Sequence, residues 1–399
     1  MGEFYDVIIV GAGPAGSYAA YELASSGHSV AVLEQKDAAG LDVCCSGIIS
    51  TECFDSFDIS PHVILTEANS AKFFSPSGRC LRLQTEKVQA YIVDRALFDR
   101  EIASKAQSRG VHYFFSSQVT DIIPGKDRMQ VETLCHGTGG IFTARAVILA
   151  NGFKPGLSQK LALGKIEHFV TGAQAEVEAR DVDEVEVYLG QRIAPGFFAW
   201  LVPGLANKTL VGLVTTSHAE THLQKFLLSP LCQGRIINRN AKVRQKIIPL
   251  GTLPHTYGDR ILVVGDAAGQ VKPTTGGGIY FGHLSAKMAA QVLGEALRQD
   301  DLSAARLSRY HKEWKTKIGK EISFGYHSRK FYARMSDRHI ERIFAMLDSE
   351  NMAQDLLHSP DFSFDWHRGL ILAGLKSGLA YPLRKLWRFL PGQGREAKS

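Results

Sequence analysis

The sequence predicts an α/β fold with a Rossmann-like nucleotide-binding domain, and three observations support this prediction. A glycine-rich turn separates an apolar run at residues 5–10 from a helical stretch that continues to about residue 24. A later apolar strand at 260–264 ends in Gly265-Asp266 and precedes a second glycine-rich helix start. The stretch 197–202 is aromatic and alternates like a strand.

The N-terminal stretch YDVIIVGAGPAGSYAAYELASSGHSVAVLEQ matches the dinucleotide-binding pattern at every element. Gly11 permits a tight turn, Gly13 lets the backbone approach a pyrophosphate, and Gly16 lets helix and strand pack closely. The next strand, 29–33, ends at Glu34, whose carboxylate can accept hydrogen bonds from a ribose diol. We therefore expect a pyrophosphate at the helix N-terminus. The expected contacts are Gly11, Gly13, Pro14, Ala15, Gly16, Glu34 and Gln35.

The distal stretch RILVVGDAAGQVKPTTGGGIYFG indicates that the dinucleotide is FAD. Asp266 can bind a ribityl hydroxyl. Gly276, Gly277 and Gly278 let the helix that begins near Ile279 direct backbone N–H groups at the pyrimidine edge of a flavin. An NAD dehydrogenase has no use for this second site, so the sequence favours FAD.

Two further pieces complete a resemblance to a known superfamily. Arg95 and Asp99 open a helix in IVDRALFDREIASKAQSRGV, and the strand TARAVILANG ends at Asn151-Gly152. With the two glycine-rich motifs, they resemble the flavoproteins that include aromatic hydroxylases, flavin halogenases and geranylgeranyl reductases. The resemblance implies FAD contacts at Arg95, Val119 and Gly152. It also implies three regions. A discontinuous FAD domain would comprise residues 1–70, 88–160 and 248–300, and an inserted antiparallel substrate-binding sheet would comprise 71–87 and 161–247. A C-terminal helical region would follow at 301–399.

Within this superfamily, two stretches resemble the geranylgeranyl reductase family. GFFAWLVPGLANKTLVG is similar to that family's Tyr-x-Trp-x-Phe-Pro…Val-Gly signature, with Phe198, Trp200 and Pro203 as the implied substrate contacts. CSGIIS is similar to Cys-Gly-Gly-Gly-Leu-Ser, although serine and isoleucine replace two glycines. The resemblance implies that Cys45, Ser46 and Gly47 lie beside the isoalloxazine ring, where Cys45 is the candidate catalytic residue and proton relay. Its neighbour Cys44 is expected to point the opposite way, as a buried hydrophobe.

The family reduces isoprenoid double bonds with FAD that is itself reduced by NAD(P)H or ferredoxin, so the resemblance implies a polyprenyl substrate and one of these donors. From the residues alone, the aromatic strand can either line a long apolar slot or fill a sheet core. Aromatic hydroxylases usually carry Asp where this chain has Asn151, and halogenases carry Trp where it has Phe198. Both stay as alternatives, as does a quinone-facing electron carrier without a prenyl slot.

Composition and charge restrict the partners. A net charge of +6 on 399 residues, spread along the chain, does not predict nucleic-acid binding, and the cysteines lack the spacing of a metal site. Sparse cysteines and the lack of a signal-peptide pattern predict a cytoplasmic protein. In the segment 376–399, Leu383, Leu386, Trp387 and Leu390 share one helical face opposite basic residues. This face predicts either peripheral contact with an anionic membrane or a helix docked on the protein itself.

Overall fold

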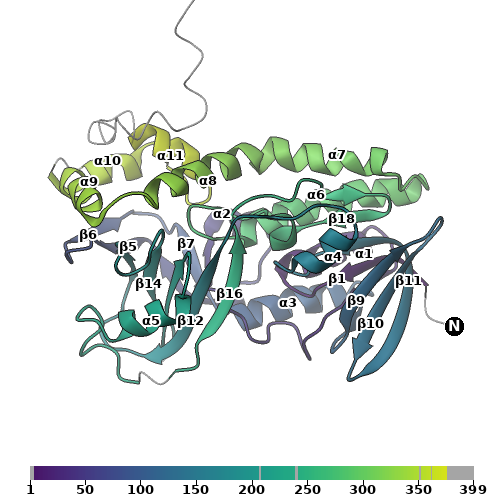
Figure 1. Cartoon of the computed structure of the whole chain (residues 1–399), viewed down its shortest axis with the longest axis horizontal. Helices are drawn as coiled ribbons and strands as arrows, with labels where there is room; N and C mark the ends of the chain where they lie inside the picture. The colour runs from purple at the N-terminus through teal and green to yellow at the C-terminus, as the bar shows by residue number, and fades with distance from the viewer. Residues whose placement is uncertain (1–3, 206–207, 239–240, 350–351, 361, 375–399) are drawn as a thin grey trace, which may run out of the picture.

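The computed structural model describes residues 4–205, 208–238, 241–349, 352–360 and 362–374. Two large sheets lie side by side, and helices run across the top of both in the view of Figure 1. A smaller three-stranded sheet accompanies them.

The eight-stranded sheet carries the expected nucleotide-binding topology. Its strands are β1 Phe4–Val10, β2 Val30–Leu33, β8 His112–Phe114, β9 Gln118–Pro124, β10 Met129–Cys135, β11 Thr138–Leu149, β17 Tyr257–Gly258 and β18 Ile261–Val263. The main path runs β17-β18-β11-β1-β2-β8, and β1 pairs in parallel with both β2 and β11. The first half of β11 pairs instead with β10, which with β9 forms an antiparallel arm. The predicted strands around both glycine-rich motifs are therefore confirmed.

Both faces of this sheet are covered, which explains the continuous apolar runs of its central strands. One face packs against the helices α1 Pro14–Ser25, α3 Arg95–Gln107, α6 Ile279–Arg298 and α7 Ala304–Trp314. The other face packs against β9, β10 and α4 Pro155–Lys160, with Met129, Val131 and Leu157 among the buried contacts. The sheet is thus the rigid base from which the loops at the ends of β1, β2 and β18 project.

The seven-stranded sheet is the antiparallel sheet that the resemblance implied. Its strands are β5 Ser70–Phe74, β6 Cys80–Gln84, β12 Phe169–Glu178, β13 Val185–Leu189, β14 Phe198–Pro203, β15 Lys208–Thr215 and β16 Arg244–Pro249. They are ordered β16-β12-β15-β14-β13-β5-β6, and only the β13–β5 pair is parallel. Helix α5 Ala219–Leu227 covers one face through Leu223 and Phe226.

The three-stranded sheet connects these two parts. It consists of β3 Ile48–Ser50, β4 Ile64–Ala68 and β7 Ala90–Val93, in the order β3-β7-β4. Helix α2 Thr51–Phe57 and the single-turn helix η1 Pro61–Val63 lie between its strands in sequence, and the turn η2 Gly265–Ala268 follows β18.

The C-terminal region is helical as far as the structure describes it. Helix α7 continues through a π-helical turn, η3 Lys315–Gly319, into α8 Lys320–Tyr332. The later helices are α9 Asp337–Ser349, α10 Met352–His358 and α11 His367–Gly374. Figure 1 shows α9 and α10 above the β5–β6 edge of the seven-stranded sheet, where Ile340 and Phe344 pack with Phe73. The expected basic helix around 383–390 lies outside the described residues, and among those described no helix is long and apolar enough to cross a membrane.

Candidate active site

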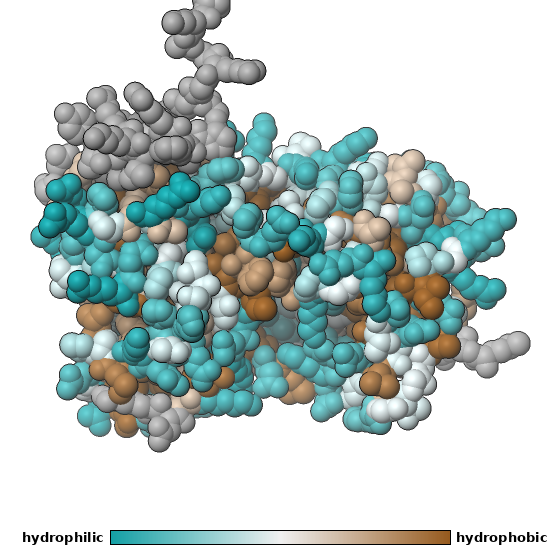
Figure 2. All heavy atoms as spheres, viewed as in Figure 1, coloured by the Kyte–Doolittle hydropathy of each residue, from teal (hydrophilic) through white to brown (hydrophobic). Residues whose placement is uncertain are grey.

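A cavity of about 1530 Å³ is lined by both large sheets and by the C-terminal helices. We call the part formed by the loops 11–15, 34–35 and 265–279 its glycine end. We call the part between β5, β6, β13 and the helices α9 and α10 its apolar end. On the face seen in Figure 2, apolar side chains gather near the middle of the molecule, in the hollow between the two halves.

The first glycine-rich turn has the geometry that a pyrophosphate requires. Gly11 has a φ of +108°, and a Cβ atom there would lie 2.5 Å from the carbonyl oxygen of Ala150. A Cβ atom on Gly16 would lie 2.0 Å from the carbonyl oxygen of Gly11, so α1 can approach the turn only with glycine at that position. A Cβ atom on Gly13 would meet nothing within 4 Å, and this residue lines the cavity. The cavity therefore has room for a ligand directly against the N-terminus of α1.

Glu34 is fixed at the end of β2 by backbone donors. Its carboxylate accepts hydrogen bonds from the N–H groups of Ala12, at 2.8 Å, and Lys36, at 3.0 Å. The neighbouring Gln35 accepts a hydrogen bond from Lys154 Nζ at 2.6 Å. These contacts hold an acidic group beside the glycine turn, where the ribose of a dinucleotide needs an acceptor.

The second glycine-rich stretch brings the two large sheets together. Asp266, in η2, forms an ion pair of 2.7 Å with Lys246 of β16. The carboxylate raises the pKa of Lys246, which keeps this lysine charged. Gly276, Gly277 and Gly278 also line the cavity and lead directly into α6. Sequence reasoning identified Asp266 but missed Lys246, because nothing in the pattern of a polar strand shows which distant carboxylate it will meet.

Cys45 lies in the loop that precedes β3 and lines the cavity. Its carbonyl oxygen accepts a hydrogen bond of 3.2 Å from Gln174, and its side chain interacts with the buried guanidinium of Arg95. Arg95 also donates to Asp99 at 2.6 Å. Burial would lower the pKa of Arg95, but the charge of Asp99, with a contribution from Cys45, raises it. A permanently charged guanidinium therefore stands beside the thiol.

Cys44 differs from its expected place. It lines the same cavity and is only partly buried, with Sγ 3.6 Å from the carbonyl oxygen of Arg244. The expectation that adjacent residues point to opposite sides holds for a strand, but this loop is irregular and does not alternate. Burial raises the pKa of the Cys44 thiol to about 11, so the thiol is neutral near pH 7.

The aromatic strand β14 faces two ways, as its alternation predicts. Ala199 and Leu201 pack towards α5, whereas Phe198 and Trp200 line the cavity. Trp200 is paired with Gly212 of β15, and a Cβ atom at Gly212 would lie 2.5 Å from the indole. The glycine thus makes room for the tryptophan ring across the neighbouring strand, which explains why the motif contains both.

The apolar end is the part that the sequence did not reveal. Ile340, Ile343, Phe344 and Leu347 follow helical spacing along α9, but this pattern indicates only a buried face and not what covers it. In the structure, part of this face forms the wall of the cavity. The apolar end is lined by Phe73, Leu81, Leu83, Leu189, Met335, Ile340, Ile343, Phe344, Leu347, Leu356 and Leu357.

The cavity brings together most of the residues that the sequence singled out. Ser46, Arg95, Val119, Gly152 and Ile279 line it with those described above. Gly16, Gly47 and Pro203 do not line it. Gly47 instead fixes its loop, since its φ is +75° and a Cβ atom there would lie 2.6 Å from the carbonyl oxygen of Val93.

The fold and these residues fit FAD, because the glycine turn, Glu34 and Asp266 offer partners to successive parts of a flavin dinucleotide. The protein is an FAD-dependent oxidoreductase. Residues 5–185 match the pyridine nucleotide-disulphide oxidoreductase family. A digeranylgeranylglycerophospholipid reductase of Methanocaldococcus jannaschii is 30% identical, over 86% of this chain and 90% of its own length. One from Methanothermobacter thermautotrophicus is 32% identical, over 85% and 89%. The chain belongs to this reductase family.

Solved structures show how widely the fold is shared. A geranylgeranyl bacteriochlorophyll reductase-like protein of Thermoplasma acidophilum superposes with a TM-score of 0.83 at 23% identity, over 97% of this chain and all of the other. The flavin-dependent halogenase CmlS reaches 0.66 at 19% identity, over 97% and 78%. The fold is therefore common to reductases and halogenases, and membership of the reductase family decides between them.

Proposed function

We propose that this protein reduces double bonds in the geranylgeranyl chains of a lipid, using FAD bound at the glycine end. The observation that carries the proposal is the cavity itself, in which the dinucleotide residues and the apolar end share one continuous space. A flexible isoprenoid chain needs a long apolar channel that opens onto the cofactor. The names of the related reductases support this substrate class.

The residues that would hold FAD follow its length. The backbone of residues 11–15 and the N-terminus of α1 would bind the pyrophosphate, and Glu34 the adenosine ribose. Asp266 would accept a hydrogen bond from the ribityl chain, and Gly276 to Gly278 would face the pyrimidine edge. When bound and reduced, FAD supplies a hydride to one carbon of an alkene.

The rest of the cavity would orient the substrate and keep water out. Phe198 and Trp200 would lie along the isoprenoid chain near the cofactor, and the apolar end would hold the remainder of the chain. Such a wall holds the double bond at a fixed position and excludes solvent from a reaction that water does not assist. Pro203 ends β14 and does not line the cavity, so it would fix the end of this strand and would not touch the substrate.

Cys45 is the residue that we propose as the proton donor. After hydride transfer to one alkene carbon, the S–H proton would pass to the other, and the thiolate would regain a proton from solvent. The contact between the Cys45 side chain and the buried guanidinium of Arg95 would hold the thiol in position for this transfer. Ser46 and Gly47 would hold this loop against the flavin.

The electron donor and the cellular setting are further parts of the proposal. NAD(P)H would bind transiently, or a ferredoxin would dock, to reduce the flavin before each turnover. The segment 376–399 would bring the protein to the cytoplasmic face of a membrane, where its lipid substrate resides. We also propose the three-part division that the sequence predicts, into an FAD domain, an inserted substrate sheet and a C-terminal helical region.

Mass spectrometry of a digeranylgeranyl lipid, after incubation with dithionite-reduced protein, tests the function. We expect purified protein that is yellow and releases FAD on denaturation, and products that gain two hydrogens for each reduced double bond. Products that gain oxygen would indicate a hydroxylase instead. An unchanged lipid, with flavin that reduces and reoxidises normally, would indicate a quinone-facing electron carrier.

A further inference from the structure

A buried ion pair lies at the glycine end of the cavity and includes a residue from the C-terminal region. Lys272 Nζ lies 2.5 Å from Asp365 Oδ1, and the two side chains are only 8% and 3% exposed. Both residues line the cavity, and Lys272 belongs to the loop 265–279 of the glycine end. Neither residue is among the contacts that we propose for FAD or for the substrate. Lys272 follows η2, and Asp365 precedes α11, so the pair joins segments 93 residues apart in sequence.

Lys272 lies against the glycines that precede α6. Its N–H group donates to the carbonyl oxygen of Gly277 at 2.9 Å, and its own carbonyl oxygen accepts from the N–H group of Gly276 at 2.8 Å. A Cβ atom at Gly277 would lie 3.0 Å from Lys272 Cε and 3.5 Å from Nζ. The ammonium charge is therefore held directly behind the backbone that we propose for the flavin pyrimidine.

Asp365 is held in place by a short segment, residues 363–368, that we call the strap. Trp366 Nε1 donates to Glu52 at 3.1 Å, and His367 Nδ1 lies 2.5 Å from Thr274 Oγ1. Glu321 of α8 accepts hydrogen bonds from the N–H groups of His367, at 2.7 Å, and Arg368, at 2.9 Å. These contacts fix the strap to three separate elements, so the position of the carboxylate is set by the fold.

The pair is a costly way to fill this space. Removing two charges from water carries a desolvation penalty that apolar side chains of similar size do not carry. The second oxygen of Asp365 is also buried, with no hydrogen-bond partner among the described residues. Stability alone therefore does not explain the pair, whereas an effect of its charges on a ligand in the cavity does.

We propose that Lys272 and Asp365 together set the reduction potential of the bound flavin. Two-electron reduction of FAD with uptake of one proton adds one negative charge, which resides at the pyrimidine end of the ring. The cation of Lys272 stabilises this added charge, and Asp365 acts as a positioning residue that holds the ammonium group and offsets part of its field. This inference rests on the proposed binding of FAD and adds the groups that tune it.

Titration of the FAD-loaded protein with dithionite against a reference dye tests the proposal. In K272M the potential falls, because the stabilising cation is lost. In D365N it rises, because the ammonium charge is no longer offset. We expect each change to alter the ratio of reduced to oxidised flavin at least about tenfold, or about 30 mV for a two-electron couple. The matched control is K317M, since Lys317 lies over the ring of Trp366 in the strap but does not line the cavity.

The two opposite shifts separate this role from a structural one. A pair that only stabilises the strap would lower the midpoint of unfolding in both variants and leave the potential unchanged, or shift it in one direction; either result overturns the proposal. Where K272M does not fold, K272Q keeps a donor to Asp365 and gives the same measurement. Wild-type protein that binds no FAD would instead overturn the proposed function, so the two failures are distinct.

Discussion

The two ends of the cavity are built in different ways. The glycine end is made of backbone turns and a few fixed polar groups, such as Glu34 and Asp266, each held by specific hydrogen bonds or ion pairs. The apolar end is made of side chains from β5, β6 and β13 and from helices that come last in the chain. A charged, rigid cofactor requires directional partners at defined points, whereas a flexible hydrocarbon chain requires only shape and dryness. The following substitutions test this difference.

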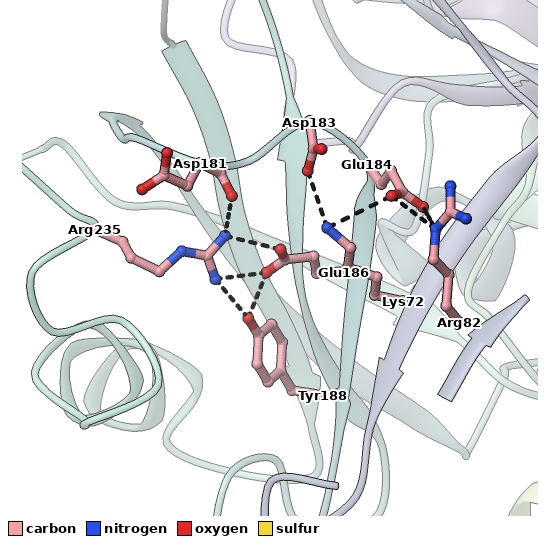
Figure 3. A network of polar contacts seen from close by, with 8 residues as sticks. All are labelled: Lys72, Arg82, Asp181, Asp183, Glu184, Glu186, Tyr188 and Arg235. Carbon is pink, nitrogen blue, oxygen red and sulfur yellow. Dashed lines mark hydrogen bonds and ion pairs between the residues drawn. The ribbon is translucent and has the colours of Figure 1, made fainter. Parts of the chain in front are cut away.

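The largest effect is expected where the seven-stranded sheet buries a charge. Figure 3 shows Arg235 bonded to Glu186, with both contacts at 2.8 Å, and Glu186 is 2% exposed. Arg235→Ala leaves this carboxylate without its cationic partner, although the Tyr188 hydroxyl still donates to it at 2.5 Å. The substitution should lower the free energy of unfolding by about 3–5 kcal/mol, measured by urea denaturation. Lys72→Ala is the control in the same network. Its partner Asp183 is 75% exposed, and its second partner Glu184 keeps Arg82 at 2.9 Å, so the loss should be at most about 1 kcal/mol. Equal losses in the two variants would show that burial does not set the difference.

The next effect separates folding from binding at the glycine end. Gly16→Ala forces a methyl group against the carbonyl oxygen of Gly11 and should cost about 3 kcal/mol of stability, with loss of flavin. Gly13→Ala meets no protein atom within 4 Å and should leave the midpoint of thermal unfolding unchanged, while flavin affinity falls. Full flavin content in Gly13→Ala would place the pyrophosphate elsewhere.

Cys45→Ala tests the junction between the two ends. Loss of a proton donor should slow alkene reduction about 100-fold, while flavin content stays at the wild-type level. Cys44→Ala is the matched control: it removes a thiol from the same loop and should retain most of the activity. The measurement is product formation after chemical reduction, which removes the electron donor from the comparison. Turnover at the wild-type rate in Cys45→Ala would show that Cys45 has no catalytic role.

Acidification should weaken the helical layer under the glycine end. Burial lowers the pKa of His283 in α6 to about 4 from an ordinary value of 6.5. Between these values the unfolded chain binds more protons than the folded one, so stability is fully present above pH 6.5 and falls as the pH drops towards 4. Between pH 7 and pH 5, His283 should lower the free energy of unfolding by about 2 kcal/mol.

His283→Gln should remove most of that pH dependence, measured as the urea midpoint at each pH. His218→Gln is the control, because His218 is exposed at the start of α5. An unchanged pH profile in His283→Gln would show that His283 does not become protonated on unfolding in this range.

The smallest effect is expected at the apolar end, where many side chains share one task. Leu347→Trp narrows the cavity and should lower turnover of a long-chain lipid about tenfold, without changing flavin content. Arg342→Trp places the same ring on the exposed side of α9 and should have no effect. Equal turnover in both variants would show that the substrate does not occupy the apolar end of the cavity.

Local patterns in the sequence predicted the glycine end closely. Gly11, Gly13 and Gly16 lie at a fixed spacing from the end of β1 to the first turn of α1, and Asp266 follows directly from the end of its own strand. The features of β14 are also local, because its alternating residues and the glycine paired with Trp200, Gly212, lie within one short stretch of sequence. Such features are local, so the sequence could determine them.

Only the tertiary structure decided what meets across the cavity. The partners of Asp266 and Lys272 are Lys246 and Asp365, which come from a different sheet and from the strap. Cys44 and Cys45 both line the cavity, because the loop that carries them, before β3, is irregular and does not alternate as a strand does. The apolar face of α9 could have packed on any apolar surface, since hydrophobic burial has no direction of its own. The sequence therefore determined the motifs and the class of cofactor, and long-range packing determined which side chains complete the site.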